Sequence, residues 1–483
     1  MPNTMTNESE KNLRLEQNSI GKNLENFIEN LNSLMETFPF SMISIEVVRY
    51  TTEKIFSLHQ EVLRKMEGVD LSTLNLNEEQ LELLTEAFKR TQKASIAKKL
   101  VARSFIVSVV SQYDAFVGSI IKTLFVNKPD TLNVSEKQLT FSELMSFGSI
   151  EAATEHIIEK EIETVLRKSH SEQFDWLGNK FGVKLRENLH VWPDFIELTQ
   201  RRNLFVHADG LVSQQYISVC EENNCYDKDT LQRGSELAVD YEYFAKSHDS
   251  IFEISVKLAH VLWRKVLPEQ RHDADINLNK IGYELLVGKK YKLSHKVFDF
   301  AVNTLKKYSS EEMRLTFIIN LAQSLKWGGD DRGSLKLINA QDWSATMESF
   351  KLCQNVLLSN FAEAKVLMLK IGAEGSISKR DYCTWPIFQE FRVSTEFQST
   401  FESLFGLHEA TKNNDSNTDD QITIELSAVL GLNDVLNVLA GFYTGAIPSN
   451  ELTTHLDEIN KRLVKTHEKQ RETSVDTEDK IIS

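Results

Sequence analysis

Apolar residues recur every three or four positions along most of the chain, which is the spacing of one face of an α-helix. Near the start this pattern is carried by Leu24, Phe27, Ile28, Leu31 and Leu34. It predicts helices over 20–35 and 43–66. Asn77-Glu-Glu-Gln80 then supplies a helix N-cap followed by acidic first-turn residues, and a new helical pattern begins. Residues 1–95 are therefore predicted to form an N-terminal helical region.

The longest apolar stretch runs from Ala97 to Val126. It is interrupted by Lys98, Lys99, Arg103, Gln112, Asp114 and Lys122. These polar residues favour a buried core helix over a membrane span, which needs about 20 predominantly apolar residues. Further helical patterns follow around 140–168, 170–180, 192–210 and 238–266. Together they predict a helical bundle over 96–268.

The pattern changes after a polar break at 271–279. Three helix–turn–helix units follow, beginning near Gly282, Leu315 and Phe350, and the glycine-rich stretch 328–333 is predicted to be a turn between two helices. A spacing of roughly 34 to 40 residues resembles tetratricopeptide-type units.

This resemblance implies tetratricopeptide-like helical repeats over 275–410. Asn413–Asp420 has the composition of a linker, and residues 421–483 are predicted to be a helical segment with a charged tail. Seven prolines and 19 glycines are few for 483 residues, so the whole chain is predicted to be all-α.

Composition limits the classes of function. The formal net charge is −15, which argues against a protein that coats nucleic acid regardless of sequence, although a local basic cleft stays compatible with it. Four cysteines without a CxxC pair predict neither a disulfide framework nor a zinc site, and no metal or cofactor is expected. The polar N-terminus has no apolar signal core, so we expect a cytoplasmic protein without a membrane segment.

One short motif stands out, Arg202-Asn203-Leu204-Phe205-Val206-His207, with four residues between Arg202 and His207. It resembles the R-x4–6-H signature of HEPN domains, and Asp114 in the long apolar helix upstream matches the acidic residue of that pattern. The resemblance covers roughly residues 97–266. It implies an endoribonuclease of an antiphage-defence or toxin type, with two copies of the motif facing each other in a homodimer.

The residue types suit RNA cleavage by the neighbouring 2′-OH, which needs no metal. His207 can move protons near neutral pH. The forked guanidinium of Arg202 can hold the phosphate and stabilise developing charge. Asn203 lies four residues from His207 on the same helix face and can orient the imidazole or bind the phosphate. In the alternative interpretation, His207 only stabilises a helix C-terminus and Arg201-Arg202 is a solvated pair.

Other polar residues near the motif are secondary candidates. Arg201, Lys98, Lys99 and Arg103 could contact RNA phosphate, although a solvated helix face is the competing interpretation for the last three. Replacing Arg201 is expected to be mild, since it points to another face than Arg202. Asp114 is either a buried structural acid or a partner of the motif, and both alternatives stay open.

Two functions remain in view. The first is a ribonuclease with RNA as substrate and a protein regulator or antitoxin bound by the repeats, because helical repeats bind proteins on a concave face. The second is a non-catalytic adaptor that uses the bundle to dimerise and the repeats as a platform. An adaptor has no physical need for Arg202 and His207 to share a groove, whereas a nuclease does.

Overall fold

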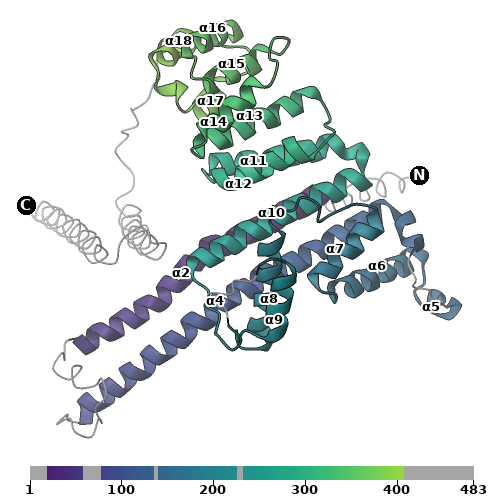
Figure 1. The fold of residues 1–483 in the computed structure, drawn as a ribbon, viewed down its shortest axis with the longest axis vertical. Helices are drawn as coiled ribbons and strands as arrows, with labels where there is room; N and C mark the ends of the chain where they lie inside the picture. Colours follow the sequence, from purple (N-terminus) through teal and green to yellow (C-terminus); the bar gives the residue numbers. More distant parts are fainter. Residues whose placement is uncertain (1–18, 58–77, 135–139, 226–231, 407–483) are drawn as a thin grey trace, which may run out of the picture. The chain divides into compact units, whose positions relative to one another are not determined.

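The computed structural model describes residues 19–57, 78–134, 140–225 and 232–406 (Figure 1). Within these ranges the one β feature is an isolated bridge between Leu211 and Glu236, and the predicted all-α class is confirmed. The α-helices are α2 (Ile20–Ser57), α4 (Glu78–Asn127), α5 (Phe141–Ser146), α6 (Ile150–Leu166), α7 (His170–Phe181), α8 (Trp192–His207), α9 (Gln214–Glu222), α10 (Tyr241–Val266), α11 (Arg271–Val287), α12 (Tyr291–Asp299), α13 (Glu311–Trp327), α14 (Asp331–Asn339), α15 (Glu348–Leu357), α16 (Phe361–Ile371), α17 (Lys379–Thr384) and α18 (Thr395–Phe405). The predictions for 413–420 and 421–483 lie outside the described residues.

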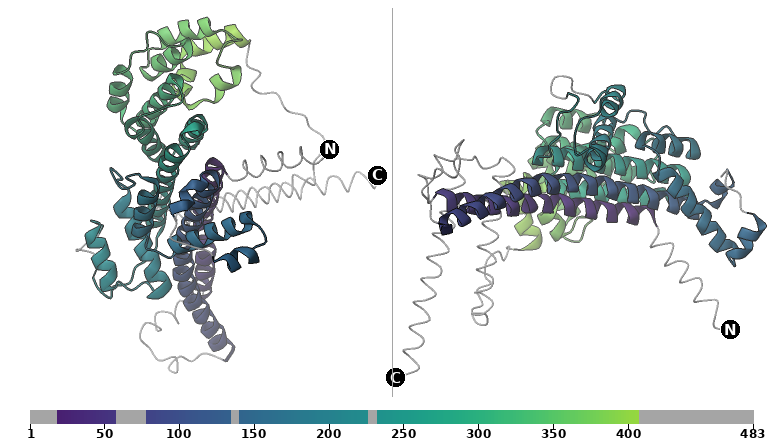
Figure 2. Two further views of the ribbon diagram at one scale, coloured as in Figure 1. Left: turned by 90° about the vertical axis from the view of Figure 1, so that its right-hand side faces the viewer. Right: turned by 90° about the horizontal axis from the view of Figure 1, so that it is seen from below.

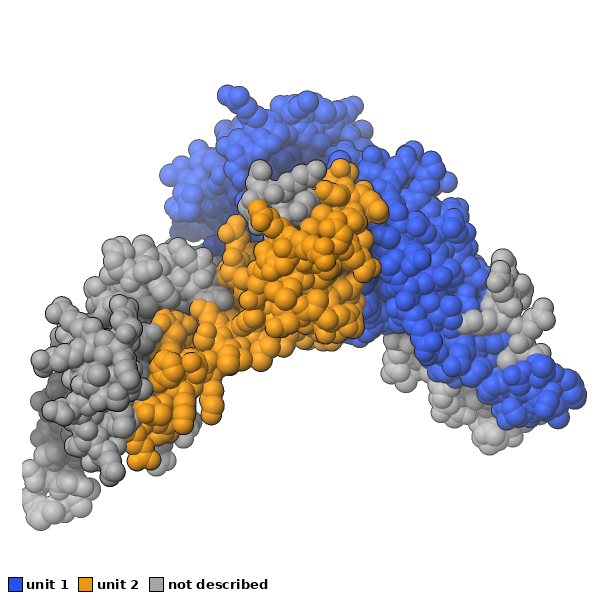
Figure 3. All heavy atoms as spheres, turned by 60° about the horizontal axis from the view of Figure 1, so that its bottom comes forward, with its two compact units in different colours: residues 1–28, 113–196, 249–414 blue, residues 29–112, 197–248, 415–483 orange. Residues whose placement is uncertain are grey.

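The chain divides into two compact units (Figure 3). Unit 1 comprises 1–28, 113–196 and 249–414, and unit 2 comprises 29–112, 197–248 and 415–483. The predicted boundary at position 95 falls inside α4, which is one uninterrupted helix there, and the predicted domain limits stay a prediction. The sequence contains no proline or glycine between Glu78 and Val117, so nothing in it ends the helix there.

Helices α2 and α4 run side by side in opposite directions, as the views of Figures 1 and 2 agree. In unit 1 the rings of Phe27 and Phe116 stack with centroids 4.6 Å apart. In unit 2 Phe38 meets Phe105 edge to face at 5.1 Å. The helix predicted over 20–35 and the first part of that predicted over 43–66 are joined in α2, which continues through Pro39 to Ser57. The rest of the second predicted helix lies outside the described residues.

One described segment of α4, Phe88–Asn127, is long and apolar enough to pass as a membrane span by length and composition. This differs from the prediction that no such segment exists. The reason is that Asp114 is the one charged residue between Ser104 and Ile121. Core helices of soluble proteins pass the same test.

Three helical hairpins in unit 1, α11–α12, α13–α14 and α15–α16, share one turn geometry. Each turn has three residues, and its second residue has a positive φ: 57° at Lys289, 94° at Gly329 and 57° at Ser359. In each, the third turn residue donates its backbone N–H to the carbonyl five residues earlier, at 2.8 to 2.9 Å. The hairpins therefore repeat a local closure, and the stretch 328–333 contains one of these turns as predicted.

The predicted polar break at 271–279 is instead the first half of α11. Its polar residues are used inside unit 1. Asp275 is fully buried and accepts hydrogen bonds from Arg264 Nη1 at 2.5 Å and from the Ser309 backbone N–H at 2.6 Å. The stretch is polar and still helical because its carboxylate is paired and buried.

Candidate functional site

The motif occupies the C-terminal half of α8, which begins with Trp192-Pro193 and ends at His207. The chain then reverses through Asp209 and Gly210, whose φ angles are 47° and 75°. The backbone N–H groups of Ala208 and Gly210 both donate to the carbonyl of Leu204, at 2.8 and 3.0 Å, and close the helix end. His207 is therefore the last residue of a helix whose end is tightly bonded.

The end of α8 is also held by packing. Leu204 is buried and belongs to a small apolar cluster with Val212, Tyr216, Ile217, Cys220 and Leu237. This cluster joins α8 to α9 and to the segment before α10. The C-terminal turns of α8 are consequently held on a rigid support.

Arg201 is part of a buried polar network. Its Nε donates to Glu197 Oε1 at 2.7 Å, its Nη1 donates to the Ala238 carbonyl at 3.1 Å, and its guanidinium lies 3.7 Å from the centre of the Tyr243 ring. Glu197 also accepts the hydroxyl hydrogens of Tyr216 and Tyr243, each at 2.7 Å. Burial, together with the Glu197 charge, raises the pKa of both tyrosines. The described contacts of Arg201 are thus structural, and a contact with RNA phosphate stays a prediction.

Arg103 is likewise committed to carboxylates. Its side chain is 6% exposed, its Nη1 donates to Asp209 Oδ1 at 2.6 Å and its Nη2 to Glu236 Oε1 at 2.5 Å. Its guanidinium also lies 5.2 Å from the centre of the Phe205 ring. Gly210 is required beside it, because a Cβ there would lie 2.6 Å from Arg103 Nη2. Arg103 therefore holds the loop after the motif in place.

The two lysines of the predicted basic helix start are paired as well. Lys99 bonds Glu236, and this hydrogen bond is the largest cause that lowers the pKa of Glu236. Lys98 lies 3.3 Å from Glu46 Oε2. These exposed pairs are weak. The sequence alone did not show that acidic residues distant in the chain would face this helix start.

The side chains of Asn203 and His207 differ from those of the basic residues just described. His207 is exposed and Asn203 is half-buried, and in the described part of the chain neither side chain has a hydrogen-bond partner. They lie four residues apart and so share one face of α8. Arg202, next to Asn203, is half-buried. The last two turns of α8 therefore place two unengaged polar groups on a firmly anchored helix.

Asp114 has a structural partner in unit 1. Its Oδ1 lies 2.9 Å from Nε2 of His170, which is 7% exposed and packs edge to face against Phe195. His170 was missed by sequence reasoning. The available signal was the capping box of Ser169 and Glu172, which fixes His170 as the first residue of α7. The pair supports the structural interpretation of Asp114, and a role beside the motif stays a prediction.

Over the described ranges, no group of three or more His, Cys, Asp or Glu side chains could hold a metal ion. The four cysteines, all within the described residues, form no disulfide, and Cys220 and Cys353 are buried.

No model of a protein family, no curated protein and no solved structure matches this chain. The likeness to HEPN domains accordingly rests on the motif and its helical setting.

Proposed function

We propose that this protein is an endoribonuclease that cleaves RNA through attack of the 2′-OH on the adjacent phosphate. One observation carries the proposal. Within a single helix the structure commits Arg201 to a buried network while it leaves Asn203 and His207 without a partner among the described residues. Polar side chains with no structural use on a rigid, exposed helix end are available to a ligand.

In the proposed step, the 2′ oxygen attacks phosphorus and the bond from phosphorus to the 5′ oxygen breaks. An imidazole takes the 2′-OH proton, and an imidazolium gives a proton to the leaving 5′ oxygen. Arg202 holds the non-bridging oxygens as charge develops. The products are a 2′,3′-cyclic phosphate and a 5′-OH. A second copy of the chain would supply the second His207, which is why we propose a homodimer.

The cellular role follows from the resemblance and is part of the proposal. Such a ribonuclease would act in the cytoplasm as an antiphage or toxin effector. Its activity would be restrained or triggered by a protein regulator or antitoxin at the hairpins of α11–α16.

The test compares purified full-length wild type with His207→Ala and Arg202→Ala on end-labelled RNA. Removing a placed general acid–base costs about 10²- to 10⁴-fold in rate, and removing a charge-stabilising donor about 10²- to 10³-fold. Arg202→Lys should recover little, because a point charge does not reproduce the bidentate fork. Matched controls are His272→Ala and Arg332→Ala, both exposed on other helices, which should cleave like wild type.

The substrate provides a second check. RNA carrying 2′-O-methyl groups should resist cleavage, because its nucleophile is blocked, and chelator should leave the rate unchanged. If both motif variants cut RNA as fast as the controls, the motif is a structural helix end and the ribonuclease proposal fails.

The adaptor is the second candidate, and exposed apolar residues favour it. Phe141, Met145 and Ile150, in and just after the short helix α5, are 78%, 66% and 72% exposed. Apolar groups gathered on a protruding segment are typical of surfaces that bind another protein. An adaptor would keep partner binding when His207 is replaced and would cleave no RNA in any variant.

A further inference from the structure

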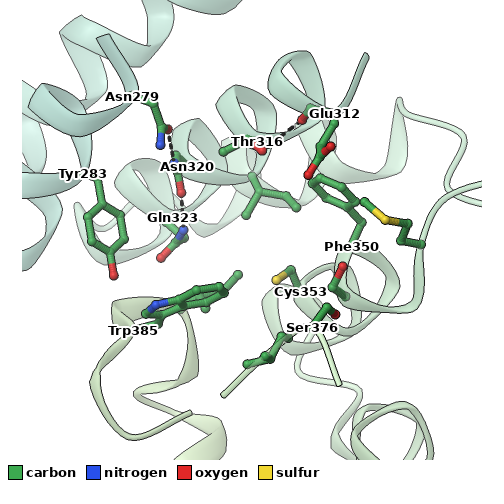
Figure 4. Close-up of a pocket in the computed structure, with 15 residues that line it drawn as sticks. Asn279, Tyr283, Glu312, Thr316, Asn320, Gln323, Phe350, Cys353, Ser376 and Trp385 are labelled. Carbon is green, nitrogen blue, oxygen red and sulfur yellow. Dashed lines mark hydrogen bonds between the residues drawn. The ribbon is translucent and has the colours of Figure 1, made fainter. Parts of the chain in front are cut away.

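A cavity of about 470 Å³ lies within unit 1 (Figure 4). Its walls come from α11, α13, α15 and the segment 376–387. Its volume is in the range of pockets that bury a ligand, roughly 300 to 1,000 Å³. No part of this cavity belongs to the motif of α8. Its walls do belong to the hairpins where the protein regulator is proposed to bind, so a ligand of this cavity would refine that part of the proposed function.

A row of three side-chain amides runs along one wall. Asn320 Nδ2 donates to Asn279 Oδ1 at 2.8 Å, and Gln323 Nε2 donates to Asn320 Oδ1 at 2.7 Å. The row ends at Gln323, whose side chain points toward Trp385 in Figure 4. Gln323 is 2% exposed, and its Oε1 is buried without a hydrogen-bond partner within the described residues.

A buried acceptor without a donor is destabilising, and most such groups in proteins are paired. An apolar side chain at position 323 would fill the same space without that cost. The neighbours on α13, such as Ile319 and Ala322, are indeed apolar and buried. The amide of Gln323 therefore pairs internally through its Nε2 alone, while its Oε1 has no partner within the described residues, and the side chain lines the cavity.

The rest of the lining fits an apolar group. Tyr283, Phe350 and Trp385 contribute aromatic rings, and the aliphatic side chain of Ile319 also lines the cavity. Cys353 also lines the cavity, but burial raises the pKa of its thiol to about 12, so it stays protonated and is no nucleophile. The chemistry of the cavity is that of binding.

The rim carries a negative charge. Glu312, exposed in the first turn of α13, is one of the lining residues. A ligand with a cationic group beside its apolar part would be favoured there, although an exposed carboxylate contributes modestly.

The geometry points to a peptide as the ligand. We propose that this cavity binds an extended peptide segment, with one bulky apolar side chain among the rings and a backbone amide paired with Gln323. A row of carboxamides can be turned as a whole, so its end presents either a C=O or an NH₂. A backbone peptide group can pair with either orientation of the Gln323 amide, because it carries both an N–H donor and a C=O acceptor. The proposal stands apart from RNA cleavage and needs no active motif.

The test uses a random seven-residue peptide library displayed on phage and selected against the full chain. Enriched sequences are synthesised and titrated calorimetrically into wild type, Gln323→Leu and Trp385→Ala. We expect one bulky apolar residue in every enriched peptide and about a tenfold loss of affinity with either variant. The matched control is Gln398→Leu, at an exposed glutamine of α18, which should bind like wild type.

Two further arms complete the design. A series of peptides is made, each N-methylated at one backbone amide. Methylation at one position should abolish binding, because it removes the N–H, or disturbs the peptide group, that pairs with Gln323. A peptide with acetylated N-terminus and amidated C-terminus distinguishes two origins of the ligand, an internal segment of a partner protein and a free peptide with charged ends. Unchanged affinity indicates an internal segment of a partner protein, and lost affinity indicates a free peptide whose amino group meets Glu312. The proposal is overturned if selection on wild type and on Gln323→Leu enriches the same peptides, or if it enriches none.

Discussion

At the scale of single residues, neighbours in the motif have opposite roles. Arg201 is enclosed by Glu197, Tyr216 and Tyr243, and its side chain is 12% exposed. Asn203 and His207 are on the side of α8 where the structure gives them no partner among its described residues. The sequence RRN does not distinguish the two arginines, because their difference depends on Tyr216 and Tyr243, which come from α9 and α10.

Arg201→Ala is therefore expected to destabilise the protein rather than to be mild. It leaves Glu197 buried without its cation, and breaking a buried pair costs on the order of 3 kcal/mol. Urea unfolding measures the change. Cleavage by the remaining folded protein should persist. A variant that keeps wild-type stability and loses cleavage would instead place Arg201 in the catalytic site.

His260 makes stability depend on pH. It is fully buried beside Trp263, and burial, helped by the charge of Arg264, lowers its pKa well below the usual value. The folded state therefore holds it neutral, whereas the unfolded chain protonates it below about pH 6.5.

Stability is thus fully present above pH 6.5 and falls as the pH drops below it, by about 1.4 kcal/mol per pH unit until the folded pKa is reached. Urea titrations between pH 7 and 5 measure this slope. His260→Phe should flatten it, while His272→Ala, at an exposed histidine, should not. An equal slope in His260→Phe would assign the pH dependence to other groups.

At the scale of elements, hydrophobic periodicity predicted helices at most of the places where they occur. It failed at their ends. Helix α4 was divided at position 95 because a change in hydrophobicity was interpreted as a boundary, although no residue there breaks a helix. The first half of α11 has the pattern of a polar break because Asp275 and Asn277 are polar, and both are buried. Periodicity reports burial of apolar side chains and does not register paired polar ones.

The loop after the motif permits a matched glycine test. Gly210 and Gly234 both have positive φ, 75° and 87°, so alanine at either strains the backbone by about 1–2 kcal/mol. A Cβ at Gly210 also meets Arg103 Nη2, whereas a Cβ at Gly234 meets nothing within 4 Å. Gly210→Ala should therefore lower the melting temperature more than Gly234→Ala. Equal losses would show that Arg103 moves aside freely.

At the scale of the whole molecule, the assembly is the main prediction. The resemblance implies a homodimer with its interface near α8. Light scattering is expected to give twice the mass of one chain, and the specific activity should fall on dilution below the dissociation constant. A monomer at all concentrations with full cleavage activity would contradict a shared site.

The polar break at 271–279 predicts that the repeats over 275–410 can be separated from the bundle before them, and a buried ion pair across this region favours the opposite outcome. Arg264 of α10 has a 9% exposed side chain and bonds Asp275, which has none of its surface exposed. A fragment of residues 1–270 keeps the cation and loses its partner, along with the donor that Ser309 gives to Asp275. Leaving a buried charge unpaired costs about 3–5 kcal/mol.

We therefore expect the 1–270 fragment to unfold at lower urea than the full chain and with poor cooperativity. Asp275→Ala in the full chain isolates the same loss without removing any helix, and it should destabilise by a similar amount. Asp273→Ala, at an exposed aspartate two positions earlier on α11, is the control and should be neutral. If the fragment unfolds as cooperatively as the full chain while Asp275→Ala is neutral, the Arg264–Asp275 pair is dispensable. The helices before residue 270 would then form an autonomous domain, as the sequence pattern predicted.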